Sequence, residues 1–196
     1  VVISSSGSGI YTRDIVTITG TAYDSSQISN VGYAIDDIAN LEYFISNATT
    51  SSTNFSFSFD SQVYSDGLHT LYIRPIDNLG GFIDFVTNFY IDNTKPVITF
   101  INPSENYQKY GGILNITIQV NDNLSLKSFT VWTNEGILTN DNSSILGQTS
   151  KIINLSWDLI SLPNDQTNSI TVILVDMANN TNYATNYFIT FNDLPE

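Results

Sequence analysis

The chain contains no cysteine, and histidine occurs once, as His69. Without cysteine there are no disulfide bonds, no thiol nucleophile and no thiolate metal ligand. Hydrolytic triads and acid–base pairs usually depend on histidine, and a zinc site needs several histidine or cysteine ligands. A glycine-rich phosphate loop leading into a helix is also absent. We therefore expect no catalytic residue and predict that the chain is not an enzyme.

Positive charge is also scarce. Six lysines and arginines stand against 19 aspartates and glutamates, which gives a net charge of −13. Nucleic-acid binding needs clustered Lys and Arg, and an anionic membrane would repel this chain, so neither is an expected partner. No run reaches the roughly 18 apolar residues of a membrane helix, so we expect no membrane insertion. The acidity is consistent with binding a metal cation or simply with solubility.

Charged residues make up only 13% of the chain, about half the usual share. Asn, Ser and Thr take their place, as is typical of proteins outside the cytosol, and β-branched and aromatic residues favour strands. We therefore expect an extracellular or cell-surface location. No signal peptide opens the sequence, so an exported protein would be a mature chain or a segment of a longer one.

Two parts of the chain repeat one pattern. Apolar or small residues occupy alternate positions in 16–22 and 114–120, and each run closes on an aspartate, Asp24 or Asp122. The offset is 98 residues (122 minus 24). The match extends to four further segments, with one inserted residue before the third and a second before the fourth. The matched positions are Val31 and Tyr33 with Phe129 and Val131; Phe55, Phe57 and Phe59 with Ile153, Leu155 and Trp157; Leu71, Ile73 and Asp77 with Ile170, Val172 and Asp176; and Phe89 and Ile91 with Ile189 and Phe191.

Alternation of period two predicts strands with one buried face, and clusters of Asp, Asn, Ser and Gly between them predict turns. About seven such strands per hundred residues are typical of a β-sandwich. The segment from Asp92 to Pro96 resembles a linker, so we predict an all-β chain with domains at residues 1–93 and 94–196. Residues 192–195 repeat the linker pattern, from which we expect a third domain in the parent protein.

Several short motifs recur with this pattern. They are Pro96, Asn102-Pro103, Gly111-Gly112, Asp122, Trp132-Thr133-Asn134, the segment 66–71 with Asp-Gly-x-His-x-Leu, and the turn 77–80. Together they resemble the tandem prokaryotic Ig-like domains of bacterial and archaeal cell-surface proteins. The resemblance implies two immunoglobulin-like, or fibronectin type III-like, β-sandwiches. It also implies stalks, spacers, adhesin shafts, surface-layer components or accessory domains of secreted hydrolases. The second copy departs from the motif, with residues 163–166 in place of 65–67 and Ser169 near the position of His69.

Two candidates for catalysis have simpler structural explanations. His69 follows a turn and enters a strand, where we expect its ring to face a neighbouring strand. Asp36 and Asp37 could in principle form a glycosidase pair, but we expect them to solvate a turn at a strand end.

Aspartates at loop positions form a candidate calcium site. In such a sandwich, the loop between the second and third strands and the loop between the last two lie at one pole. In the second copy these loops carry Asp122 and Asp176, and the linker supplies Asp92 and Asn93. Calcium takes six to eight oxygen ligands, so a cluster of these four residues is predicted to clamp the domain junction. The alternative is that each aspartate caps its own turn. Calcium is the only cofactor considered.

Seven Asn-x-Ser/Thr sequences are candidate glycosylation sites. Because Asn, Ser and Thr are so frequent, about five would arise by chance, but two lie on outward strand faces. The candidates are Asn47, Asn54, Asn115, Asn123, Asn142, Asn154 and Asn179.

Three functions remain open. The first is a structural building block of a stalk, filament or surface layer, whose partners are neighbouring Ig-like domains of the same or adjacent chains. The opening segment 1–5 could complete its own domain or pair with another chain in self-assembly. The second is an adhesin-type module that binds protein or surface glycans, and the third is an accessory domain of a secreted hydrolase. The aromatics that could form a glycan-binding platform are Tyr11, Tyr23, Tyr43, Tyr64, Tyr72, Tyr107, Tyr110 and Trp132.

Overall fold

The structure is a computed structural model that describes residues 2–4 and 10–191. The chain divides into two compact units, Val1–Asn93 and Thr94–Glu196. The linker-like residues 192–195 lie outside the described residues. In the part that the structure describes, no helix is long and apolar enough to cross a membrane. The two units are described in turn.

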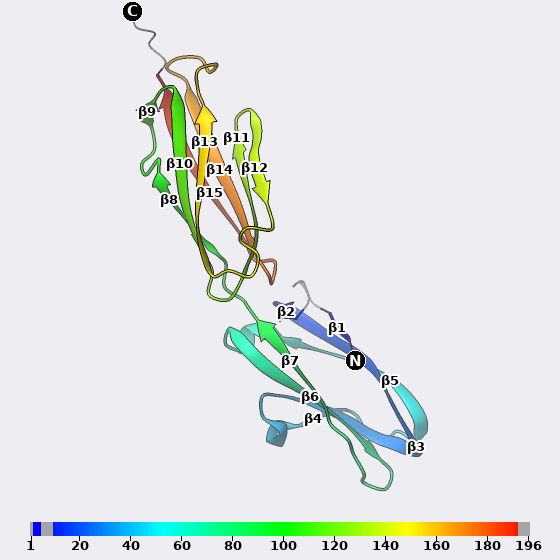
Figure 1. The fold of residues 1–196 in the computed structure, drawn as a ribbon. Helices are drawn as coiled ribbons and strands as arrows, with labels where there is room; N and C mark the ends of the chain where they lie inside the picture. The colour runs from blue at the N-terminus through cyan, green and yellow to red at the C-terminus, as the bar shows by residue number, and fades with distance from the viewer. Residues whose placement is uncertain (1, 5–9, 192–196) are drawn as a thin grey trace, which may run out of the picture. The chain divides into compact units, whose positions relative to one another are not determined.

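The first unit is built around one long strand, β3 (Ile15–Ile35), which takes part in both layers (Figure 1). Its first half pairs with β1 and β5, and its second half pairs with β4 and β6. The register shifts between Tyr23 and Ile28, where the strand passes from one layer to the other. The second layer continues through β7 to β2, which runs parallel to β7. The bounds of these strands are β1 (Val2–Ser4), β2 (Tyr11–Thr12), β4 (Glu42–Ile45), β5 (Thr50–Asp60), β6 (Gly67–Asp77) and β7 (Phe85–Ile91).

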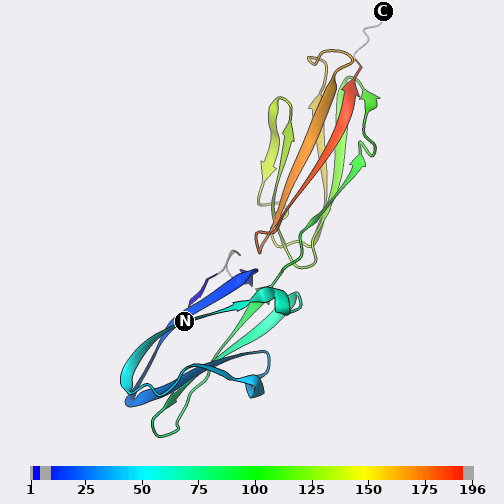
Figure 2. The same ribbon diagram turned by 180° about the vertical axis from the view of Figure 1, so that it is seen from behind.

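The second unit has the same order of strands as the first, but its two layers are separate sheets. One sheet has the order β13-β10-β8, and the other has β12-β11-β14-β15-β9. Figure 2 shows β14 in orange beside β15 in red, as their antiparallel register requires. The bounds are β8 (Val97–Asn102), β9 (Gln108–Tyr110), β10 (Ile113–Asn121), β11 (Leu126–Thr133), β12 (Gly136–Asp141), β13 (Ser150–Asp158), β14 (Thr167–Asp176) and β15 (Thr181–Thr190).

Each unit is thus a two-layered β-sandwich, and the predicted fold class is confirmed. Two short 3-10 helices connect strands of the first unit. They are η1 (Ile38–Asn40), between β3 and β4, and η2 (Ser61–Val63), between β5 and β6. No α-helix occurs between residues 10 and 191. This agrees with the period-two alternation of the sequence, which would give a helix no continuous apolar face.

The predicted alternation sets the core. Along β10, the side chains of Leu114, Ile116, Ile118 and Val120 are buried, while Asn115 and its outward neighbours face away. Burying a large apolar side chain contributes roughly 1.5–3 kcal/mol. Because the long strands of each unit have one such face, two layers must pack together to cover it.

The two cores fill one position differently. In the first unit Gly20 pairs with Phe55, and in the second Ile118 pairs with Ile153. A Cβ atom at Gly20 would collide with the ring of Phe55. The missing side chain on β3 therefore makes room for the larger one on β5, as interiors of near-crystalline packing density require.

The register predicted for the last strand is wrong by one residue. The sequence alignment matched Phe89 and Ile91 with Ile189 and Phe191, but Phe188 is the fully buried residue, whereas Phe191 is 44% exposed. Phe188 lies edge-to-face against Trp157 at 5.5 Å, just as Phe89 lies against Phe59 at 6.0 Å. A second insertion is therefore not needed. The sequence permits the error because several apolar residues stand close together there, and a shift of one residue exchanges the two faces of a strand.

The opening strand pairs within its own unit. Residues 2–4 of β1 lie antiparallel to Thr17–Thr19 of β3. In the structure this segment therefore completes its own domain, which is the first of the two arrangements expected from the sequence. Residues 1 and 5 of the segment lie outside the described part.

The corrected register makes a direct prediction. Phe188→Ala should lower the free energy of unfolding of the second unit by about 3–5 kcal/mol, because it leaves a cavity beside Trp157. Phe191→Ala is the matched control and should cost about 1 kcal/mol or less. Urea unfolding, followed by tryptophan fluorescence, measures both, because Trp132 and Trp157 lie in the second unit. A larger loss for Phe191→Ala would restore the alignment predicted from the sequence.

Candidate functional site

Two loops meet at one pole of the second unit. Residues 122–125 join β10 to β11, and residues 177–180 join β14 to β15. The N–H of Met177 donates to the carbonyl of Ser125 at 2.8 Å, and Leu126 pairs with Asp176 across the two strands. The loops that were expected to share a pole are therefore in contact.

Asp122 caps the first of these loops. Its Oδ1 accepts hydrogen bonds from the backbone N–H groups of Leu124, at 2.9 Å, and Ser125, at 2.6 Å. An aspartate that follows a strand commonly satisfies the next backbone donors in this way and so turns the chain. The turn then starts β11 in the other sheet.

Asp176 caps the second loop. Its Oδ1 accepts the backbone N–H of Asn180 at 2.8 Å, and its own N–H donates to the carbonyl of Asn180 at 3.1 Å. Asn179 has a φ of 65°, a left-handed conformation that asparagine tolerates better than most residues. The side chain of Asn179 also accepts from the ammonium of Lys127, at 2.6 Å.

The second oxygen of each carboxylate, Oδ2, takes no part in capping these loops. Oδ2 of Asp122 and Oδ2 of Asp176 are both buried, and neither has a hydrogen-bond partner among the described residues. One carboxylate oxygen of Asp122 lies within 4.8 Å of one of Asp176. No Lys, Arg or His that the structure describes lies at ion-pair distance from either residue. The pole therefore concentrates negative charge, and no cation among the described residues forms an ion pair with it.

Burial affects the protonation of this pair. It raises the pKa of Asp176 to about 6, and although hydrogen bonds from Asn180 oppose the rise, the charge of Asp122 adds to it. Asp176 is fully buried. A carboxylate in this position is stabilised either by a proton or by a cation, because water does not reach it.

Asp92 and Asn93 of the predicted calcium site belong to the first unit. The side chain of Asn93 exchanges two hydrogen bonds with Ser61, and its backbone N–H donates to Asp66 at 2.7 Å. The N–H of Asp92 donates to the carbonyl of Thr12 at 3.0 Å. Asn93 thus has a structural role in its own unit, and the part of both residues in a calcium site stays a prediction.

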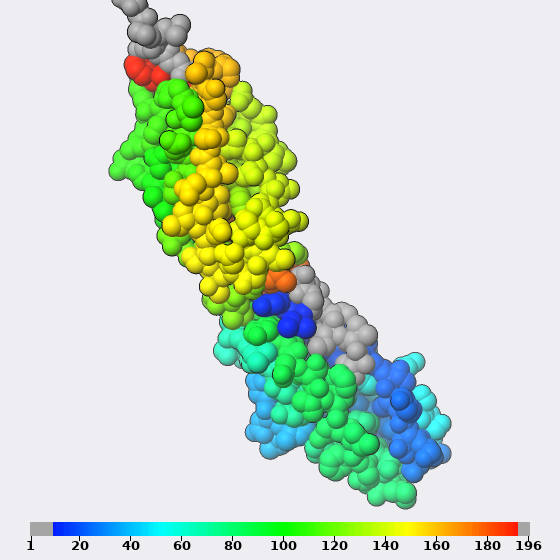
Figure 3. Space-filling model, in the orientation of Figure 1, coloured from blue at the N-terminus to red at the C-terminus, as the bar shows by residue number. Residues whose placement is uncertain are grey.

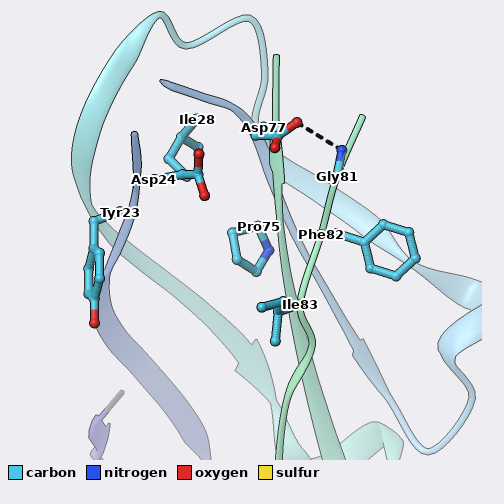
Figure 4. A pocket seen from close by; sticks show the side chains of 8 residues that line it. All are labelled: Tyr23, Asp24, Ile28, Pro75, Asp77, Gly81, Phe82 and Ile83. Atoms are coloured by element: carbon cyan, nitrogen blue, oxygen red, sulfur yellow. Dashed lines mark hydrogen bonds between the residues drawn. The ribbon is translucent and has the colours of Figure 1, made fainter. Parts of the chain in front are cut away.

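The first unit carries the repeat equivalents Asp24 and Asp77, which line a cavity of about 300 Å³ (Figure 4). Oδ1 of Asp77 accepts from Leu79 and Gly81, each at 2.8 Å, and Oδ1 of Asp24 accepts from Ser26 at 2.7 Å. Neither residue has a buried oxygen without a partner. Both aspartates therefore act as turn caps, as the alternative interpretation predicted.

His69 holds a turn in the first unit, as expected for a structural histidine. Its Nδ1 lies 2.7 Å from Oδ2 of Asp36, and its Nε2 lies 2.8 Å from the carbonyl of Ser65. Oδ1 of Asp36 accepts the N–H of Thr70 at 2.9 Å. The ring is buried against Tyr64. Both ring nitrogens are therefore occupied by partners within the fold.

Asp36 and Asp37 have different structural roles. Asp36 binds β6 through His69 and Thr70, whereas Oδ1 of Asp37 caps η1 by accepting the N–H of Ala39 at 2.9 Å. Sequence reasoning missed the link from Asp36 to His69, because the two residues stand 33 positions apart and no local pattern connects them.

The candidate aromatics do not form one group. Tyr64 and Tyr110 pack against the cores, Tyr72 is half-buried, and Tyr11 stacks on Tyr90 at 4.8 Å. The exposed members lie on four different elements, which are β3 for Tyr23, β4 for Tyr43, β11 for Trp132 and the segment before β9 for Tyr107.

The candidate glycosylation sites differ in exposure. Asn179 is half-buried, while the other six, Asn47, Asn54, Asn115, Asn123, Asn142 and Asn154, are exposed. Asn154 belongs to β13, the yellow strand that lies open on the surface in Figure 3. Exposure permits modification at these six positions, and occupancy stays a prediction.

The structural role of Asp36 can be tested against its neighbour. Asp36→Asn should lower the free energy of unfolding by about 1–3 kcal/mol, because it removes the negative charge that lies 2.7 Å from the ring of His69. Asp37→Asn is the control and should change it by about 0.5 kcal/mol or less, because asparagine caps a helix as well as aspartate does. Urea unfolding at pH 7 measures both variants. Equal small effects would contradict the assigned role.

The buried carboxyl of Asp176 predicts an unusual pH dependence. Its pKa is about 6 in the folded state and about 3.8 when unfolded, so the folded state holds more protons between these values. Its contribution to stability should therefore be largest below pH 4 and fall as the pH rises through 6. Unfolding of the chain with chelator present, compared with Asp176→Asn, isolates this contribution. Asp77→Asn is the control and should keep the wild-type slope, and an unchanged slope in Asp176→Asn would contradict the prediction.

Comparison with known proteins gives one family match and several distant structural likenesses. Residues 1–73 match a family model described as a bacterial Ig domain. No curated protein matches the chain. Among solved structures, the fibronectin(III)-like modules of Clostridium thermocellum CbhA are 16% identical, over 98% of this chain and 93% of that one, with a TM-score of 0.47.

Dimeric latent PorU from Porphyromonas gingivalis is 12% identical, over 95% of this chain and 19% of that one, with a TM-score of 0.36. Both likenesses are too distant to say what this chain binds or does. The second unit repeats the strand order of the first, which carries the family match. The first unit is therefore similar to bacterial Ig domains over residues 1–73, and the second unit shares its order of strands.

Proposed function

We propose that the chain is a non-catalytic structural pair of domains, a spacer or building block of a secreted or cell-surface protein. The observation that carries the proposal is that the residues best suited to chemistry are engaged in holding the fold. His69 and Asp36 bind each other, and Asp37 caps a helix. Bacterial Ig-like domains are typically extracellular or surface-associated, and they commonly serve as accessory or structural domains.

The arrangement of the chain supports this role. Two copies of one sandwich follow each other along the chain, with residues 92–96 between the last strand of the first unit and the first strand of the second. Repetition of small stable domains is how extended surface proteins gain length. Seven sequons, six of them exposed, would suit a glycosylated surface protein.

An adhesin-type binding module is the second candidate, and one observation favours it. Exposed apolar side chains gather at the cavity in the first unit, where Tyr23 is 80%, Phe82 54% and Ile83 84% exposed. Aromatic and apolar groups beside carboxylates suit a sugar or a peptide. An accessory role beside a secreted hydrolase would use the same features.

One experiment separates these candidates. The purified chain is examined by native mass spectrometry and electron microscopy and is then applied to a glycan array, with Tyr23→Ala in parallel. A structural role predicts no saturable glycan binding, and either separate particles of monomer mass or ordered filaments, the latter identifying a self-assembling building block. Saturable binding that Tyr23→Ala abolishes would overturn the proposal in favour of a binding module.

A further inference from the structure

We propose that Asp122 and Asp176 form a binding site for a calcium ion at the pole of the second unit, with Oδ2 of each carboxylate as a ligand. A spacer needs no ligand, so this inference goes beyond the proposed function. The site is built from two loops that the fold already holds together, through the hydrogen bond from Met177 to Ser125.

The first argument is that the two oxygens of each carboxylate have different surroundings. In both residues Oδ1 accepts backbone N–H groups and closes the loop, at distances of 2.6–2.9 Å. In both residues Oδ2 is buried and has no donor among residues 10–191. Buried polar atoms are almost always hydrogen-bonded, so two orphaned oxygens on neighbouring carboxylates indicate a missing partner.

The second argument is charge. Two carboxylates whose oxygens lie within 4.8 Å of each other repel, and burial strengthens the repulsion. The ammonium of Lys127 binds Asn179 on the same loop and makes no ion pair with either carboxylate in the described structure. A divalent cation between the two oxygens would cancel both charges at once.

The third argument concerns which cation fits. The ligands are hard carboxylate oxygens, and neither His69 nor any cysteine contributes, which disfavours zinc and other softer metals. Magnesium demands a nearly ideal octahedron and gives up its water reluctantly, whereas calcium accepts irregular geometry, so calcium fits two buried carboxylates whose positions the loops fix. Sites of this kind in extracellular modules have dissociation constants of roughly 10⁻⁴–10⁻³ M.

The first unit provides an internal comparison. Asp24 and Asp77 occupy the repeat-equivalent positions, but neither has a buried oxygen without a partner. Oδ1 of Asp77 takes two backbone donors, from Leu79 and Gly81, and its carboxylate packs directly against Gly81. The inference therefore assigns calcium to the second unit alone, although both units carry an aspartate at each position.

The test is isothermal titration of the whole chain with calcium chloride, after treatment with chelator. The wild type should show one saturable event with a dissociation constant of roughly 10⁻⁴–10⁻³ M. Asp122→Asn and Asp176→Asn should each weaken it at least tenfold, while Asp24→Asn and Asp77→Asn should leave it unchanged. Asparagine keeps the Oδ1 acceptor of each loop, so the four variants should fold, which circular dichroism checks.

A second readout is the melting temperature in 10 mM calcium. It should rise for the wild type and for the two first-unit variants, but not for Asp122→Asn or Asp176→Asn, because binding stabilises only a folded state that holds the site. No saturable heat for the wild type would overturn the proposal and would mean that the two carboxylates share a proton. Equal losses in all four variants would also overturn it, as would tighter binding of magnesium than of calcium.

Discussion

The fold depends on one constraint, which is that each strand has an apolar face that only a second layer can cover. Period-two alternation along β10 and along the first half of β3 fixes which residues face inward. The two units satisfy the constraint with different side chains, since Gly20 and Phe55 in one replace Ile118 and Ile153 in the other. The total volume is filled in both cases, and this explains how copies of such different sequence keep the same order of strands.

The same constraint places the functional chemistry at the ends of the strands. The inward positions are apolar and the strand faces are regular, so carboxylates with unusual surroundings occur where the chain must turn from one layer to the other. Asp122 and Asp176 each end a strand and each cap the loop that follows. Once Oδ1 has been used for capping, the geometry of a carboxylate leaves Oδ2 pointing elsewhere. At this pole both remaining oxygens are buried, and the two carboxylates approach each other within 4.8 Å, so a common turn-capping arrangement becomes a candidate cation site.

The sequence was sufficient to predict the β-sandwiches, because alternation and turn residues are local signals. It also predicted that Asp122 and Asp176 lie on neighbouring loops, since strand order in a sandwich determines which loops share a pole. It failed on the register of β15, where Phe188, Ile189 and Phe191 stand within four residues and one shift exchanges the faces. It could not predict that Asp36 binds His69. Nor could it predict that Oδ2 of Asp176 is buried without a donor, whereas Asp77 has no such oxygen. Those properties depend on side-chain directions in three dimensions, which no local pattern encodes.

The central claim is that the two repeat-equivalent pairs of aspartates differ, one pair holding a cation and the other only capping turns. The most direct measurement is the anomalous diffraction of a crystal of the chain soaked with a lanthanide that replaces calcium. The account predicts a peak bonded to Oδ2 of Asp122 and Oδ2 of Asp176, and none between Asp24 and Asp77. Peaks at both pairs, or a peak at neither, would contradict it.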